Sequence, residues 1–341
     1  MSAANPNDCG TLGFGRFTLT YTNRATLACS KLALRAPTVK SSHSWIWKAE
    51  TTVNPGALLL LFVTLVWGTT FPAIRVAIAH LNGAEISEIR FLIAGICMLP
   101  FAFTASKTAW RDGLLLGVVA LASYVTQAIG MEYISANRSA FLTSTNVLMV
   151  PFLGLLFGGR LSVQIVGAAV LACVGVGLMS WEGGANWIGD SLTLACALSY
   201  AIYVILLSRR IHAHDSRTLA ATQIVAMAVI GVIWLLITHP NARALATLVA
   251  HSRPVALPLI YLGVVASAGM LFLQAVGQRH VSAEKAAVIY AMEPVFAALF
   301  AWLWLHETLG TRGLIGGALV ALAVILGEWR FARKVSRESR A

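Results

Sequence analysis

The chain has 341 residues, of which 58% are hydrophobic and only 11% are charged, and its mean hydropathy is +0.76. Soluble globular proteins contain about 45–50% apolar and about 25% charged residues, so this composition excludes a water-soluble enzyme. The net charge of +11 comes from basic residues that lie between apolar runs, which indicates membrane orientation and no nucleic-acid partner. The composition therefore predicts an integral membrane protein embedded in a lipid bilayer.

Residues 1–53 differ from the rest because they are basic, rich in Ser and Thr, and poor in acidic residues. This composition is typical of an organelle transit peptide. A disordered tail or an overextended start would have the same composition, and these alternatives stay open. The segment contains no continuous apolar core of the kind found in secretory signal peptides.

Charge-free runs of membrane length divide the remaining sequence. About 20 apolar residues span a bilayer, and each span must be helical because its backbone has to satisfy its own hydrogen bonds. An all-α membrane protein is therefore the expected fold class. The runs predict ten transmembrane helices, at residues 57–79, 86–104, 113–131, 138–158, 162–181, 189–208, 218–238, 256–277, 283–304 and 312–329.

The distribution of Lys and Arg predicts that both termini are cytoplasmic. Most basic residues between the spans then fall on the inner side, and residues 330–341 form a basic cytoplasmic tail. The loop 239–255 is the exception, because it places Arg243 and Arg253 outside.

An internal repeat relates the two halves of the chain. Residues 127–140 (QAIGMEYISANRSA) match residues 274–287 (QAVGQRHVSAEKAA) at a constant offset, so that Gln127 recurs as Gln274 and Arg138 as Lys285. We therefore expect two five-helix repeats, 57–181 and 187–329. Because five is odd, the repeats cross the membrane in opposite directions, an architecture typical of secondary transporters.

Glu293 is the only carboxylate predicted to lie well inside a span. Placing an acidic group there costs roughly 2–3 kcal/mol, so it should face a protein interior or a water-filled cavity and hold a proton or a cationic group. Pro294 follows it and should kink the helix. The repeat offset places Asn146 at the corresponding position of the first half. A purely structural carboxylate, bonded to a neighbouring helix, is the alternative.

Other polar and aromatic side chains extend this candidate site for solute binding or coupling. The amides and phenol could equally join helices by hydrogen bonds, the tryptophan could lie in an interface belt, and the arginines could attract an anionic group. Arg90 could instead snorkel to the outer interface or pair with Glu85 or Glu88. The additional candidates are Gln127, Gln274, Tyr124, Trp67, Arg75 and Arg90.

Small residues predict close packing of the fifth and tenth spans, within one chain or in a homodimer. These residues are Gly167, Gly175, Gly313 and Gly317. Pro151 in the fourth span and Pro294 in the ninth are also expected to shape helix packing.

A metal centre, a cofactor and an enzymatic reaction are not expected. His212, His214 and Asp215 lie in a polar loop without a further run of ligands, and five cysteines include no CxxC pair. The sequence also contains no nucleotide-binding or hydrolase motif.

Several motifs resemble those of EamA-type transporters in the drug/metabolite transporter superfamily. Trp67-Gly68-Thr69-Thr70-Phe71 resembles the signature of the first helix, and Glu88-Ile89-Arg90-Phe91 resembles the start of the second. Met292-Glu293-Pro294-Val295-Phe296, followed by His306-Glu307-Thr308-Leu309, resembles the ninth helix. The first half departs from the pattern, with Gly159-Arg160-Leu161 where the family often has a glutamate.

The resemblance implies ten helices, two EamA domains and movement of small metabolites. We therefore expect a secondary transporter that moves an amino-acid-like or drug-like solute by alternating access, coupled to protons or to the membrane potential. Its location would be the cell membrane, or an organelle envelope if residues 1–53 are a transit peptide. A non-transporting membrane scaffold or sensor is the alternative.

Overall fold

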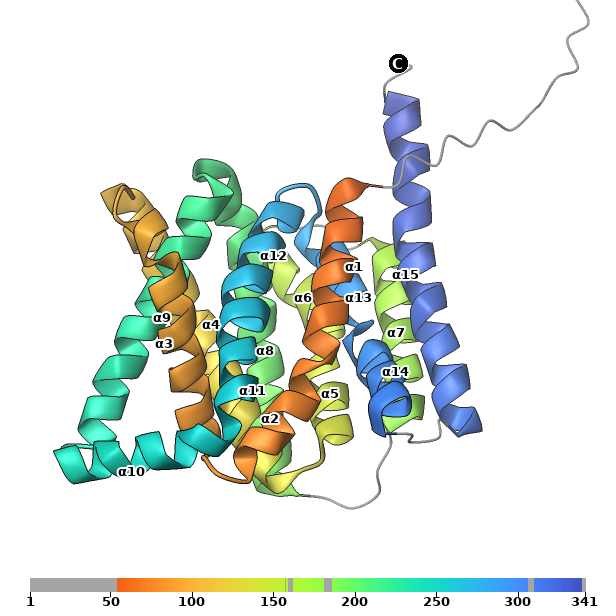
Figure 1. Cartoon of the computed structure of the whole chain (residues 1–341). Helices are drawn as coiled ribbons and strands as arrows, with labels where there is room; N and C mark the ends of the chain where they lie inside the picture. Colours follow the sequence, from red (N-terminus) through yellow and green to blue (C-terminus); the bar gives the residue numbers. More distant parts are fainter. Residues whose placement is uncertain (1–53, 157, 159–161, 181–185, 306–309, 339–341) are drawn as a thin grey trace, which may run out of the picture. The chain divides into compact units, whose positions relative to one another are not determined.

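The computed structural model describes residues 54–156, 158, 162–180, 186–305 and 310–338, and within these ranges the regular secondary structure is helical (Figure 1). The elements of the first half are α1 (Pro55–Gly68), α2 (Thr70–Ile78), α3 (Gly83–Ala102), α4 (Lys107–Tyr133), α5 (Ala136–Ser144), α6 (Asn146–Leu156) and α7 (Val163–Ser180). Those of the second half are α8 (Trp187–Arg210), the 3-10 helix η1 (Ile211–Ala213), α9 (Ser216–Thr238), α10 (Ala242–Ser252), the 3-10 helix η2 (Arg253–Val255), α11 (Ala256–Ile260), the π-helix η3 (Tyr261–Gly269), α12 (Met270–Gln278), α13 (Ala283–Tyr290), α14 (Glu293–Leu305) and α15 (Thr311–Glu338).

The predicted all-α membrane fold is confirmed. Six helical segments of the described residues are long and apolar enough to cross a membrane, and each predicted span corresponds to one helix or to consecutive helices. Two expectations were wrong. The segment 239–255 was expected to be a loop but contains α10, and α15 continues to Glu338 although its end was predicted at residue 329.

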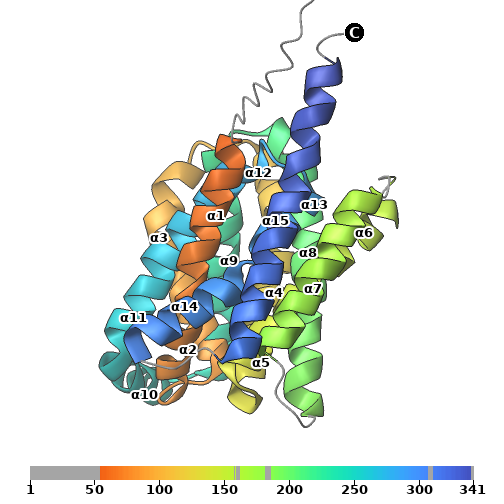
Figure 2. The ribbon, with the colours of Figure 1, turned by 90° about the vertical axis from the view of Figure 1, so that its right-hand side faces the viewer.

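The two halves interleave (Figures 1 and 2). Helix α3 packs against α9, α4 packs against α8, and α7 packs against α15. The repeat offset relates α4 to the segment α11–η3–α12. In the second half α12 packs against α1, just as α4 of the first half packs against α8. Such crosswise pairing is what two inverted repeats produce, and it buries large side chains such as Leu60, Phe91, Leu116 and Tyr203 between them.

Two spans are interrupted by prolines, and each proline lies four residues after the last residue of the helix that ends. Helix α13 ends at Tyr290 and Pro294 follows, while α1 ends at Gly68 and Pro72 follows. Proline has no amide hydrogen, so neither Tyr290 nor Gly68 receives the helical hydrogen bond on its carbonyl. The expected kink at Pro294 is therefore a complete break, and Glu293 is the first residue of a new helix.

The span of the first half that corresponds to α13–α14 is broken by polar side chains. The Thr145 hydroxyl donates to the Leu142 carbonyl at 2.6 Å, and Asn146 Nδ2 donates to the Thr143 carbonyl at 2.8 Å. These side chains compete with the backbone N–H groups that would continue the helix. Asn146 therefore begins α6 as Glu293 begins α14.

Helices α7 and α15 approach closely at one of the glycines that were singled out. A Cβ on Gly175 would lie 2.7 Å from the Gly316 carbonyl oxygen, so glycine is needed there. A Cβ on Gly167 would meet no atom within 4 Å, and the expected close approach at that residue was wrong for the described part of the chain.

The other residues predicted to pack helices have ordinary surroundings. A Cβ on Gly317 would lie 3.7 Å from Val295 Cγ1, which is a normal contact, and Gly313 is half-buried in α15. Pro151 is buried inside α6, and Pro294 is buried as the second residue of α14.

Some of the sequence interpretations fall outside the described residues. These are the transit-peptide and tail interpretations of residues 1–53, the motif 159–161 and the carboxylate Glu307.

Candidate functional site

Four buried aromatic residues meet inside the bundle, and we call Trp67, Tyr200, Tyr203 and Tyr290 the aromatic cluster. The Trp67 ring centroid lies 6.1 Å from that of Tyr200 and 5.7 Å from that of Tyr290. The Tyr200 centroid lies 5.8 Å from those of both Tyr203 and Tyr290. The rings come from α1, α8 and α13, so the cluster joins both repeats next to the breaks that end α1 and α13.

Two glutamines on one face of α12 hold the tyrosine hydroxyls in place. Gln274 Nε2 donates to the Tyr200 hydroxyl at 3.0 Å, and the Tyr203 hydroxyl donates to Gln274 Oε1 at 3.2 Å. The Tyr290 hydroxyl donates to Gln278 Oε1 at 3.3 Å. Because both amides are buried, these bonds fix the orientation of the rings.

Arg90 is buried in α3 and lies against aromatic rings. Its Nε donates to the Ser267 hydroxyl at 2.9 Å, and its Cζ lies 4.9 Å from the Tyr124 centroid and 5.4 Å from the Phe91 centroid. Its Nη2 has no hydrogen-bond partner among the described residues. One buried end of the guanidinium is therefore not used by any described residue.

The structure differs from one interpretation of Arg90. It neither snorkels to the interface nor pairs with Glu88, because its side chain turns inward to Ser267 in η3. Glu88 is itself buried and faces Gly231 of α9, and its Oε2 lacks a partner among the described residues. The expectation that Glu293 is the only carboxylate well inside a span was therefore wrong.

Glu293 is half-buried and lies at the positive end of the α14 dipole. It lies three residues after Tyr290, a member of the aromatic cluster that ends α13. The bundle therefore holds a buried base, Arg90, against the Tyr124 and Phe91 rings and a half-buried acid, Glu293, at the start of the helix that follows Tyr290.

Trp67 is anchored to the second half of the chain. Its Nε1 donates to the Ala266 carbonyl at 3.0 Å, and Thr69 in the neighbouring break hydrogen-bonds with the Tyr261 hydroxyl. Ala266 and Tyr261 both belong to the π-helix η3, so one segment of the second half contacts both residues. Trp67 is thus a buried member of the cluster and not part of an interface belt.

Asn146 and Gln127 form a second, smaller polar group around Thr143. Gln127 Nε2 donates to the Thr143 hydroxyl at 3.2 Å, and Asn146 bonds the carbonyl of the same residue. Asn146 Oδ1 is buried without a partner among the described residues. Arg75 does not join either group, because it is exposed and its Nη1 donates to the Met131 carbonyl at 3.1 Å.

A cavity of about 470 Å³, which we call the vestibule, lies where α12 ends and α13 begins. Its lining includes Ser208, Arg209, Gln278, Arg279 and Ser282. Gln278 both lines the vestibule and accepts the Tyr290 hydrogen bond, so it connects the opening with the buried rings.

Sequence reasoning missed Tyr200, Tyr203, Tyr290 and Gln278. A signal existed, because Tyr200 and Tyr203 are three residues apart and Gln278 follows Gln274 by four, spacings that place each pair on one helix face.

The residues singled out as an improbable metal site have a structural role. His214 contacts Asp112, with 2.9 Å between His214 Nε2 and Asp112 Oδ2. Within the described residues, no group of three or more His, Cys, Asp or Glu side chains could hold a metal ion.

Comparison with known proteins gives the chain its family. The model of the EamA-like transporter family matches residues 54–181 and 187–327. An uncharacterized transporter of Archaeoglobus fulgidus is 30% identical over 268 residues, covering 78% of this chain and 83% of that protein. A probable amino-acid metabolite efflux pump of Escherichia coli is 26% identical over 296 residues, covering 82% of this chain and 97% of the pump.

A solved crystal structure shares the fold, with a TM-score of 0.65 at 14% identity, and covers 82% of this chain and 98% of its own. The family model covers most of the chain in two segments that lie on either side of residues 182–186, as the two-repeat interpretation expects. The family consists of transporters and not enzymes. This multi-pass membrane protein belongs to the EamA-like transporter family.

Proposed function

We propose that the protein binds a zwitterionic, amino-acid-like metabolite at the aromatic cluster and carries it across the membrane by alternating access. One observation carries the proposal: the buried Arg90 guanidinium has a nitrogen without a partner among the described residues, and Glu293 begins the helix that follows the break after Tyr290 of the aromatic cluster. A guanidinium binds a carboxylate through directed N–H bonds, and a carboxylate binds an ammonium group. The rings supply apolar contact for the remainder of the solute.

The broken helices support a site that changes shape. Many secondary transporters bind solutes where discontinuous helices meet between inverted repeats, and rocking of the repeats then exposes the site to each side in turn. Here the breaks that end α1 and α13 lie beside the aromatic cluster. The name of the Escherichia coli relative supports an amino-acid metabolite as the solute and efflux as the direction.

Two alternatives remain testable. Aromatic rings and Glu293 would also suit a drug-like cation, through cation–π attraction. The positive charge of the buried Arg90 opposes such a solute. A scaffold or sensor would bind without transporting.

The experiment compares three solutes that share one apolar group in proteoliposomes. Phenylalanine carries both charges, phenethylamine only the positive one, and 3-phenylpropanoate only the negative one. We expect counterflow with phenylalanine and little with the others. Counterflow that favours phenethylamine would support a cation carrier instead, and the absence of counterflow with every solute would contradict a transport function.

Two variants separate the roles of the charged residues. Arg90→Gln should raise KM for phenylalanine about tenfold or more, because a charge-assisted hydrogen bond contributes about 1.5–3 kcal/mol. The same variant should leave phenethylamine transport unchanged or improved. If both solutes lose flux equally, Arg90 has a structural role only.

Proton coupling is assigned to Glu293. Glu293→Gln should abolish the dependence of flux on external pH, because the amide cannot exchange a proton. Glu88→Gln is the matched control, since Glu88 is a buried carboxylate outside the aromatic cluster. If only Glu88→Gln removes the pH dependence, the assignment to Glu293 is wrong.

We also propose that the protein lies in the cell membrane with the end that holds Lys107 on the cytoplasmic side. In a background without native cysteines, a membrane-impermeant thiol reagent applied to intact cells should label Arg243→Cys and not Lys107→Cys. The reverse pattern would overturn the orientation.

A further inference from the structure

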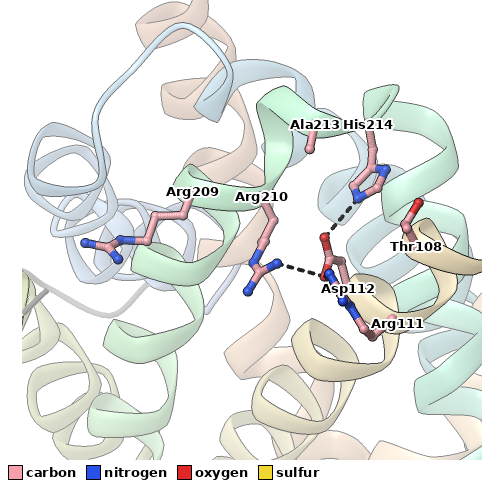
Figure 3. Close-up of a pocket in the computed structure, with 7 residues that line it drawn as sticks. All are labelled: Thr108, Arg111, Asp112, Arg209, Arg210, Ala213 and His214. Atoms are coloured by element: carbon pink, nitrogen blue, oxygen red, sulfur yellow. Dashed lines mark hydrogen bonds and ion pairs between the residues drawn. The ribbon is translucent and has the colours of Figure 1, made fainter.

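A basic cavity lies where α4 begins and α8 ends, outside the aromatic cluster (Figure 3). Its volume is about 590 Å³. Its lining includes Thr108, Arg111, Asp112, Arg209, Arg210 and His214.

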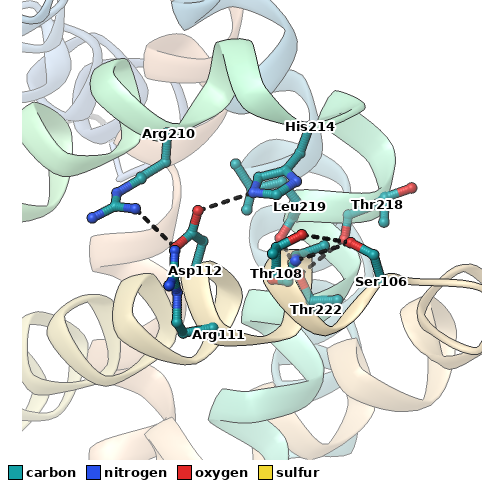
Figure 4. Close-up of polar contacts among 10 residues, drawn as sticks. Ser106, Thr108, Arg111, Asp112, Arg210, His214, Thr218, Leu219 and Thr222 are labelled. Carbon is teal, nitrogen blue, oxygen red and sulfur yellow. Dashed lines mark hydrogen bonds and ion pairs between the residues drawn. The ribbon is translucent and has the colours of Figure 1, made fainter.

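Asp112 organises this cavity. Its side chain is only 5% exposed, and its Oδ1 accepts a hydrogen bond from Arg210 Nη1 at 3.0 Å, while Oδ2 contacts His214 Nε2 at 2.9 Å (Figure 4). The Arg111 guanidinium lies 3.4 Å from the same carboxylate. The carboxylate thus holds two guanidinium groups at one wall and neutralises a single positive charge.

The cavity retains positive charge and donors after these contacts. Two arginines, Arg111 and Arg210, contact one carboxylate. The side chains of Arg111 and Arg210 are 72% and 38% exposed, and each guanidinium has five N–H donors, most of which the contacts with Asp112 leave unused. A phosphate group, which accepts several directed N–H bonds at once, is the complementary ligand.

The outward face of α4 continues from the cavity as an apolar stripe. Leu114, Leu115 and Val118 follow Arg111 at intervals of three, four and seven residues and therefore share its helix face. They are 50%, 40% and 48% exposed, respectively. The cavity is thus open to the side of the bundle that faces the acyl chains of the bilayer.

We propose that this cavity binds the head-group phosphate of an anionic phospholipid, whose acyl chains lie along α4. Basic pockets at the ends of membrane helices are suited to such head groups. The apolar stripe favours a lipid over free phosphate, because only the lipid has a part that fills both the cavity and the stripe. Asp112 of α4 contacts Arg210 at the end of α8 and His214 in the segment before α9, so the bound lipid would tie α4 to the connection between α8 and α9.

The test measures binding by the whole purified protein. Phosphatidylglycerol is titrated into the detergent-solubilised protein, and bound lipid is counted by native mass spectrometry while the melting temperature is followed. Phosphatidylcholine and inorganic phosphate form the two comparison arms. We expect one saturable phosphatidylglycerol and a rise in melting temperature that the comparison arms do not produce.

Matched variants locate the site. Arg111→Gln should weaken phosphatidylglycerol binding about tenfold, because a charge-assisted contact is lost. Lys107→Gln removes the same charge one turn earlier on α4 but does not line the cavity, so at physiological salt it should weaken binding by about twofold or less. The Arg111→Lys variant keeps the charge but loses the forked set of N–H donors, so its loss of phosphatidylglycerol binding should lie between those of the other two variants.

Three outcomes would overturn the proposal. Equal binding of phosphatidylcholine would show that the head-group charge is irrelevant. Equal losses in Arg111→Gln and Lys107→Gln would show a diffuse surface effect without a site. A melting shift that inorganic phosphate produces in full would assign the cavity to a soluble anion.

Discussion

Replacing Pro294 with alanine tests whether transport needs the break between α13 and α14. The alanine would supply the amide hydrogen that the Tyr290 carbonyl lacks and would remove the ring that clashes with a continuous helix. A proline inside a helix costs about 3 kcal/mol relative to alanine. The exchange can therefore shift the balance from the broken toward the continuous helix by roughly a hundredfold.

A continuous helix would turn Glu293 and Tyr290 away from their present positions, so we expect phenylalanine counterflow to fall at least about tenfold. The melting temperature should stay equal or rise, which separates this effect from misfolding. Pro151→Ala is the matched control, because Pro151 lies inside α6 and not at a break. Hydrogen exchange at residue 294 reports the new bond. Full flux together with a protected amide at residue 294 would refute the reasoning.

Two further predictions concern helix contacts at the breaks and ends. Gly68→Ala places a Cβ 2.8 Å from Phe296 Cβ, so α1 and α14 should separate. We expect the protein to lose about 1–3 kcal/mol of stability and to show reduced flux. A wild-type melting temperature and flux would contradict this prediction. The Arg138–Asp190 pair joins α5 to α8 at 2.6 Å with both side chains 17% exposed, so a double-mutant cycle of Arg138→Gln and Asp190→Asn should give a coupling of about 1 kcal/mol in reversible unfolding. Additive effects of the two substitutions would show that the pair contributes nothing.

The spans could be predicted because bilayer thickness and backbone hydrogen bonding leave few alternatives for long apolar runs. The positions of the breaks were only partly predictable. Pro294 was expected to kink its helix, but the interruption lies at Tyr290, four residues earlier, where the carbonyl loses its donor. In the first half the break depends on how Thr145 and Asn146 orient their side chains, which sequence does not specify.

Contacts between distant helices account for what sequence reasoning missed. Arg90 looked like an interfacial residue because its position near a helix start allows snorkelling. Its burial follows from Ser267, 177 residues away, and from the Tyr124 ring of a neighbouring helix. Helix α10 was missed because its 11 residues are too short to span a bilayer and two arginines suggested a loop.

The π-helix η3 makes the two repeats unequal. Its counterpart in the first half, α4, is a regular helix, whereas η3 supplies the oxygens that receive Trp67 and Arg90. A carrier built from identical halves would present the same binding site to both compartments. Because this one takes its anchoring oxygens from one half alone, we expect the concentration of solute that half-saturates exchange to differ between the inner and outer faces. With this difference in half-saturation, a solute gradient of given size would drive faster net transport in one direction than in the other at low solute concentrations.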